Sequence, residues 1–118
     1  MPISPVAPFL TAEAAWFWTM AVLEARRDPG RPRPSAGPCA VEDVLRCLDG
    51  LYRQRRLELL HARILRIWGA RGIAPDRRRP GQRCDAALGA AAMERLGWAL
   101  RGQGIVAGAC VNSWKEAV

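Results

Sequence analysis

Apolar positions recur at helical spacing along much of this 118-residue chain. The clearest pattern begins at Val41, where the apolar positions cover about 120° of a helical wheel and Arg46 and Asp49 lie opposite. This pattern predicts an amphipathic helix that buries one face in a core. Its apolar positions are Val41, Val44, Leu45, Leu48, Leu51 and Tyr52.

A second apolar stripe follows at once, but it lies roughly 150° away from the first on a continuous helical wheel. One straight helix cannot bury both stripes, so the chain is predicted to turn near residues 53–56, although neither Gly nor Pro marks the bend. Residues 41–69 are therefore predicted to form two short helices whose apolar faces meet, a helix-turn-helix-like pair. The second stripe consists of Leu57, Leu60, His61, Ile64, Ile67 and Trp68.

The pattern also predicts a helix over residues 12–27, which Thr11 is placed to cap. Trp16, Phe17 and Trp18 are consecutive, so their rings spread over roughly 200° of that helix and cannot all face one core. At least one ring is expected to meet a second packing surface of the domain, a partner protein or a membrane surface.

Residues rich in Pro and Gly separate the predicted helices. Residues 1–10 contain three prolines and predict an extended lead-in, and residues 28–38 contain four prolines and two glycines and predict a loop. These segments are therefore predicted to lie outside the helices and to form no helix themselves.

The C-terminal part begins with an alanine-rich stretch that predicts a helix over residues 84–104, stopping at Gly102 and Gly104. Ile105 and Val106 are expected to dock on the core, and residues 107–118 are expected to form a flexible tail. The chain as a whole, residues 1–118, is predicted to be a single all-α domain, a bundle of about four helices.

The net charge of the chain indicates a class of partner. The net charge is +7 and the pI about 10.5, and every basic residue except Lys115 is an arginine. Residues 46–83 contain eleven basic and three acidic residues, so this segment carries the whole excess. A GC-rich genome would produce part of the arginine content. The remainder favours an anionic partner.

The leading functional hypothesis is therefore a nucleic-acid-binding, DNA-regulator-like protein whose recognition helix spans residues 58–69. Arg63 and Arg66 would reach phosphates and guanine edges, while Leu60 and Trp68 would hold the angle of the helix. The other arginines would follow the DNA or RNA backbone or enter a minor groove. A two-fold homodimer would suit such a regulator, although nothing in the sequence requires one. The candidate nucleic-acid-binding residues are Arg55, Arg56, Arg63, Arg66, Arg71, Arg77, Arg78 and Arg79.

The alternative is a protein–protein interaction adaptor that binds its partner through Trp16, Phe17 and Trp18 or through the C-terminal helix. Aromatic residues and arginines are the residues that interface centres favour. One contiguous positive face would favour nucleic acid, whereas scattered arginines beside an uncovered aromatic patch would favour a protein partner.

No motif in the chain specifies a chemical reaction: phosphate-binding loops, dinucleotide fingerprints, zinc-protease motifs and calcium loops are absent. The single histidine, His61, lies within an apolar stripe and is interpreted as a core histidine. Cys39, Cys47, Cys84 and Cys110 lack the paired spacings of a zinc or redox site and are interpreted as reduced thiols. We therefore expect no enzyme activity, no metal and no cofactor.

The apolar run in residues 14–23 has the wrong context for a signal peptide, because Arg26 and Arg27 follow it instead of preceding it. It is also shorter than the 20 or so residues that cross a bilayer. We expect a soluble, cytoplasmic protein with no membrane attachment.

Three segments together resemble a group of small uncharacterised helical proteins of alphaproteobacteria. They are SPVAPFLTAEAAWFW at residues 4–18, LYRQRRLELLHARILRIWGARGIAPD at residues 51–76 and LRGQGIV at residues 100–106. The resemblance implies a bacterial cytosolic protein with a helix-turn-helix-like middle, and it supplies no activity, cofactor or binding residue. This chain has Gln103 where the group tends to have a lysine, and its last helix is richer in alanine.

Overall fold

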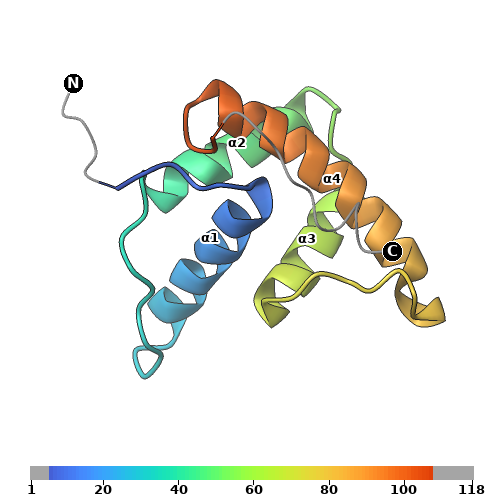
Figure 1. Cartoon of the computed structure of the whole chain (residues 1–118), viewed down its shortest axis with the longest axis horizontal. Helices are drawn as coiled ribbons and strands as arrows, with labels where there is room; N and C mark the ends of the chain where they lie inside the picture. Colours follow the sequence, from blue (N-terminus) through green and yellow to red (C-terminus); the bar gives the residue numbers. More distant parts are fainter. Residues whose placement is uncertain (1–5, 108–118) are drawn as a thin grey trace.

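Four α-helices make up most of the part of the chain that the computed structural model describes, residues 6–107 (Figure 1). The prediction of an all-α bundle with about four helices is confirmed. A short 3-10 helix, η1 (Pro80–Gln82), precedes the last α-helix. The α-helices are α1 (Ala12–Arg27), α2 (Val41–Arg53), α3 (Leu59–Arg71) and α4 (Arg83–Gly102).

The helix α1 begins where the sequence predicts, because Thr11 caps it. The Thr11 hydroxyl oxygen accepts a hydrogen bond from the Ala14 N–H at 3.0 Å, which satisfies one of the free donors of the first turn. Glu13 in that turn complements the helix dipole.

The turn between α2 and α3 lies close to the predicted position and needs no glycine. Arg55 adopts the left-handed conformation, with φ of 60°. The N–H of Arg56 donates to the Leu51 carbonyl at 2.9 Å, and the N–H of Arg55 donates to that of Tyr52 at 3.0 Å. These bonds satisfy carbonyls at the end of α2 and offset the cost of about 1–2 kcal/mol for a left-handed arginine. Leu57, just after the bonds, is buried.

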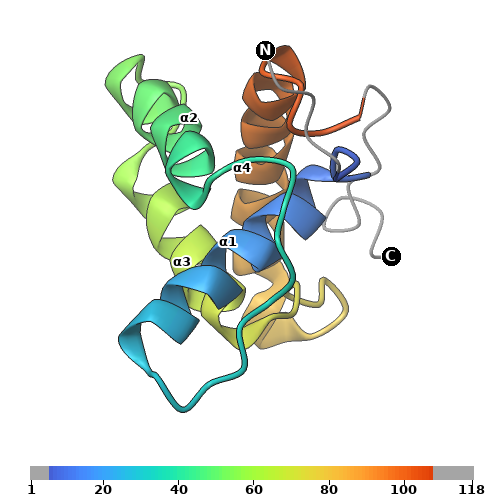
Figure 2. The same ribbon diagram turned by 90° about the vertical axis from the view of Figure 1, so that its left-hand side faces the viewer.

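The predicted contact between the apolar faces of α2 and α3 is wrong. Both helices pack mainly against α1 and α4, and α4 runs beside both of them (Figure 2). The turn points α3 away from α2, so the buried residues of the two stripes pack on α1 and α4. The buried residues that form the shared core include Trp16, Met20, Val44, Leu51, Leu65, Trp68, Met93, Leu96 and Leu100.

The two ends of the described chain lie side by side. The Phe9 N–H donates to the Ile105 carbonyl at 2.9 Å, and the Ala107 N–H donates to the Phe9 carbonyl at 2.8 Å. Ile105 and Val106 are buried, which confirms the prediction that they dock on the core. Ala107 belongs to this pairing, and the rest of the tail predicted for residues 107–118 lies outside the described residues, as do residues 1–5 of the predicted lead-in.

Candidate interaction groove

The three consecutive aromatic residues of α1 have three different environments. Trp16 is 3% exposed, and its indole N–H donates to the Leu65 carbonyl at 2.8 Å. Trp18 donates to the Ser35 carbonyl at 2.9 Å and packs against Phe9, with the ring centroids 5.3 Å apart. Phe17 is half-buried. The second packing surface within the domain therefore accounts for most of these rings, and Trp16 is not an exposed partner contact.

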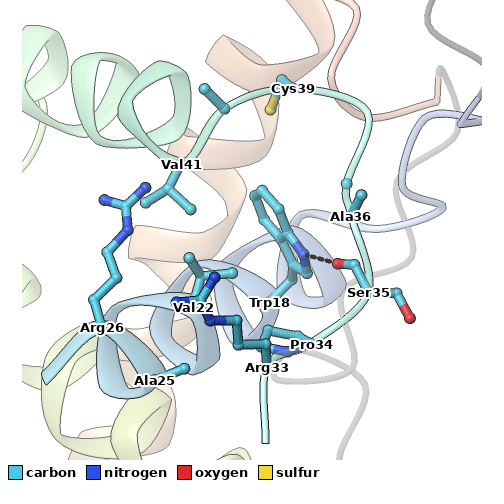
Figure 3. Close-up of a pocket in the computed structure, with 12 residues that line it drawn as sticks. Trp18, Val22, Ala25, Arg26, Arg33, Pro34, Ser35, Ala36, Cys39 and Val41 are labelled. Atoms are coloured by element: carbon cyan, nitrogen blue, oxygen red, sulfur yellow. Dashed lines mark hydrogen bonds between the residues drawn. The ribbon is translucent and has the colours of Figure 1, made fainter. Parts of the chain in front are cut away.

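A pocket of about 420 Å³ separates α1 from the proline-rich loop (Figure 3). Trp18 and Arg26 line it, but the Trp18 N–H is bonded to Ser35 and the Arg26 guanidinium binds the Glu42 carboxylate at 2.7 Å. The hydrogen bond from Arg26 lowers the pKa of the Glu42 carboxyl. The Trp18–Ser35 bond therefore holds the loop on α1, and the Arg26–Glu42 pair joins α1 to the first turn of α2.

A larger groove of about 1120 Å³ lies between α1, α2 and α3, and most of its lining is apolar. Trp16 and Met20 form its buried part on α1, and Leu45 and Leu48 of α2 are half-buried beside it. The groove exists because α2 and α3 are splayed apart. We call this site the α1–α2–α3 groove.

The helix α3 exposes large apolar side chains in this groove. Leu59 is 73% exposed, Leu60 47% and Ile67 39%, and all three line the groove. On a helical wheel they share an arc of roughly 120° with Arg63 and Arg66, opposite the buried face of α3. The apolar surface of α3 is therefore wider than the part that the bundle buries.

The charged residues around the α1–α2–α3 groove are four arginines and one glutamate, Glu24. Arg27 lies 3.9 Å from Glu24, and Arg26 is paired with Glu42. Arg63 and Arg66 have no ion pair with any residue of the described chain. The groove therefore combines an apolar surface with positive charge available to a ligand.

The other predicted nucleic-acid-binding arginines lie away from this groove, in separate places. Arg55 and Arg56 line a hollow beside the turn after α2. The Arg71 guanidinium lies over the ring of Trp68, 4.7 Å from its centroid. The arginine run after α3 surrounds Asp76, which lies 3.6 Å from Arg78 and 3.9 Å from Arg79; Arg77 is exposed in the same run. The structure thus divides the eight arginines instead of collecting them on one helix face.

His61, Cys39 and Cys47 lie in environments that are typical of structural residues. His61 is 8% exposed, and its Nδ1 accepts a hydrogen bond from the Glu58 N–H at 3.1 Å, which fits a core histidine. Burial, together with the nearby Asp43 carboxylate, raises the pKa of the Cys39 and Cys47 thiols. These thiols therefore remain protonated at neutral pH and are poor nucleophiles.

A cluster of metal ligands and a membrane-spanning helix are both absent from residues 6–107. Within that range no three or more His, Cys, Asp and Glu side chains are grouped so that they could hold a metal ion. None of the described helices combines the length and the apolar character needed to span a bilayer.

The chain matches no protein-family model, no curated protein sequence and no solved structure.

The sequence pattern contained a sign of the groove that the prediction did not use. Leu59 is adjacent to a stripe that already includes Leu57, Leu60 and His61, so α3 carries more apolar positions than one buried face can hold. The prediction assigned Leu60 and Ile67 to the core. The structure instead leaves both at the surface of the groove.

Proposed function

We propose that the protein is an interaction module that holds an amphipathic helix of a partner protein in the α1–α2–α3 groove, and that this helix carries acidic residues along its flanks. The observation that carries the proposal is the row of exposed Leu59, Leu60 and Ile67 side chains in one groove. Contiguous exposed apolar surface of this kind marks interaction sites, since it costs free energy when left in water.

The dimensions and lining of the groove favour a helix as the occupant. Its volume of about 1120 Å³ exceeds the range of about 300–1,000 Å³ that is usual for small-molecule pockets. An amphipathic helix presents apolar anchors at i, i+3, i+4 and i+7, which fit a groove walled by other helices. Acidic flanks would meet Arg63 and Arg66, which are exposed and unpaired within the described chain.

The same charges argue against a second copy of this chain as the occupant. A two-fold dimer through the groove would place the same positive rim on both sides of the interface. The net charge of +7 adds to that repulsion.

Fluorescent model peptides test this proposal. One peptide is an amphipathic helix with leucine anchors and glutamate flanks, and its matched control has lysine flanks. We expect the acidic peptide to bind and the lysine peptide to bind at least tenfold more weakly, because like charges across an interface are unfavourable. Equal affinity for the two peptides would contradict the assigned charge of the partner.

Variants of the groove residues test whether the peptide binds in the α1–α2–α3 groove. We expect Leu60→Gln/Ile67→Gln to weaken binding of the acidic peptide by roughly tenfold or more. We expect Arg63→Glu/Arg66→Glu to make the protein prefer the peptide with lysine flanks. Ile73→Gln is the control, since Ile73 is exposed but lies outside the groove. Unchanged binding by the Leu60/Ile67 variant, or a dimer that this variant dissociates in sedimentation, would rule out the proposed occupant.

Nucleic-acid binding by the arginine-rich segment is the second candidate, supported by the eleven basic and three acidic residues between Arg46 and Arg83. A labelled duplex should then bind with steep salt dependence and lose affinity in Arg63→Ala/Arg66→Ala. Leu60→Gln/Ile67→Gln separates the two candidates, because it removes apolar contacts and leaves the arginines in place. No duplex binding at low salt would end this second candidate.

A further inference from the structure

A second surface of the molecule combines an exposed aromatic ring with arginines. Trp98 of α4 is 58% exposed, and the Arg56 guanidinium lies over its ring, 4.9 Å from the centroid. The position of Arg56 is supported from α4, because the Arg95 guanidinium donates to the Arg56 carbonyl at 2.7 Å. The turn after α2 is thereby fastened beside Trp98.

The charge around Trp98 is positive. A hollow of about 430 Å³ is lined by Trp98 together with Arg56, Arg95 and Arg101, and Glu94 is the one carboxylate in that lining. These three arginines form no ion pair with the described part of the chain. Their charge is therefore available to an anionic ligand.

Trp98 and Arg101 also line a second hollow, of about 690 Å³, between α2 and α4. Arg56 does not line this hollow, so the guanidinium stacked on Trp98 does not occupy it. Most of the lining is apolar, and Gln54 and Gln103 line the hollow as well. The hollow thus brings together an exposed aromatic residue, two glutamines and one arginine.

We propose that this site, Trp98 with Arg56, Arg95 and Arg101, binds single-stranded nucleic acid. An unpaired base stacks on Trp98 in the hollow between α2 and α4, where Gln54 and Gln103 can hydrogen-bond to its edge. The adjoining phosphates lie against Arg101 and the arginines of the first hollow. A base paired within a duplex cannot place its face on the ring, so the site selects strands with unpaired bases.

This proposal does not depend on the α1–α2–α3 groove. No residue of the groove lines either hollow, so the loss of one binding activity leaves the other intact. It also uses Trp98, Arg95 and Arg101, none of which is among the candidate nucleic-acid-binding residues that the sequence predicted.

The test is the binding of a short fluorescein-labelled oligothymidine to the full chain at low and rising salt, with thymidine monophosphate and a duplex as competitors. The variants are Trp98→Ala and Arg101→Gln. Their matched controls are Tyr52→Ala, which removes another exposed aromatic ring, and Arg83→Gln, which removes another exposed arginine of α4. Circular dichroism verifies that each variant is folded.

We expect salt-sensitive binding of the strand that Trp98→Ala weakens roughly 5- to 150-fold, the range typical for a lost base–aromatic stack. Arg101→Gln should weaken binding and reduce its salt dependence, and both controls should bind like the unmodified protein. No binding at low salt, or unchanged affinity in Trp98→Ala, would overturn the proposal. A monophosphate that competes as well as the strand would assign the site to free nucleotides instead, and a duplex that competes equally would remove the requirement for unpaired bases.

Discussion

A single side chain, Trp16, shows how the helices of this protein come together. Its ring is buried between α1 and α3, and its N–H donates to the Leu65 carbonyl within α3. A buried indole N–H without such a partner would cost about 1–3 kcal/mol. The close approach of the two helices depends on Gly69, because a Cβ there would lie 2.6 Å from the Trp16 Nε1 and 2.7 Å from the Met20 Cγ.

We therefore predict that Gly69→Ala destabilises the protein. The added methyl group forces Trp16 and Met20 to move, which costs about 1–3 kcal/mol in a packed core. Gly50→Ala is the matched control, since a Cβ at Gly50 of α2 meets nothing within 4 Å. In a helix interior that change should stabilise by roughly 0.5–1 kcal/mol. Urea unfolding of both variants measures the effect, and equal stability of the two would contradict the packing of α1 on α3.

At the scale of the elements, α3 is a helix with two apolar faces that have different roles. One face packs in the core through Ile64, Leu65 and Trp68, and the other carries Leu60 and Ile67 in the groove. The sequence pattern alone predicts that both faces of α3 are apolar. Which face is covered depends on where the other helices lie.

Two isoleucines of α3 test this division directly. Ile64 is 5% exposed and belongs to the core cluster, so Ile64→Ala should cost about 2–5 kcal/mol of the free energy of unfolding. Ile67→Ala removes the same atoms from the groove face and should cost less than about 1 kcal/mol. Thermal and urea unfolding of the two variants provide the comparison. A loss at Ile67 as large as that at Ile64 would mean that the groove face stabilises the fold and is not held ready for a partner.

The features of the structure that could be predicted are those that depend on residues close together in the sequence. The cap at Thr11, the two stripes of α2 and α3 and the alanine-rich stretch of α4 predicted the number of helices and, to within a few residues, their ends. The turn was predictable without a glycine, because the stripes could not share one helix.

The groove and the Trp98 site were not predictable in the same way, because both depend on contacts between distant segments. Arg56 reaches Trp98 across 42 positions of the chain, and its carbonyl is held by Arg95. No periodicity in the sequence reports such a pairing. The splayed arrangement of α2 and α3 likewise follows from their separate contacts with α1 and α4.

The whole molecule is closed by the meeting of its described ends. The chain before α1 and the chain after α4 form a parallel bridge between Phe9 and Val106, and Phe9 in turn packs against Trp18. Ile105 and Val106 then enter the same core cluster as α1 and α4. We therefore expect these residues, which are far apart in sequence, to unfold together with the bundle.

This closure predicts that one residue near the end of the described chain is important for global stability. Ile105 is 5% exposed, so Ile105→Ala should cost about 2–5 kcal/mol. That is a large share of the roughly 5–15 kcal/mol that stabilises a typical domain. Ile73→Ala is the matched control, because Ile73 is 59% exposed in the loop after α3 and its loss should change stability by about 0.5 kcal/mol or less. If a single cooperative transition shifts only in Ile105→Ala, the ends are part of the folding unit. If Ile105→Ala unfolds at the same urea concentration as Ile73→Ala, the bridge between Phe9 and Val106 is a surface contact and the bundle is stable without it.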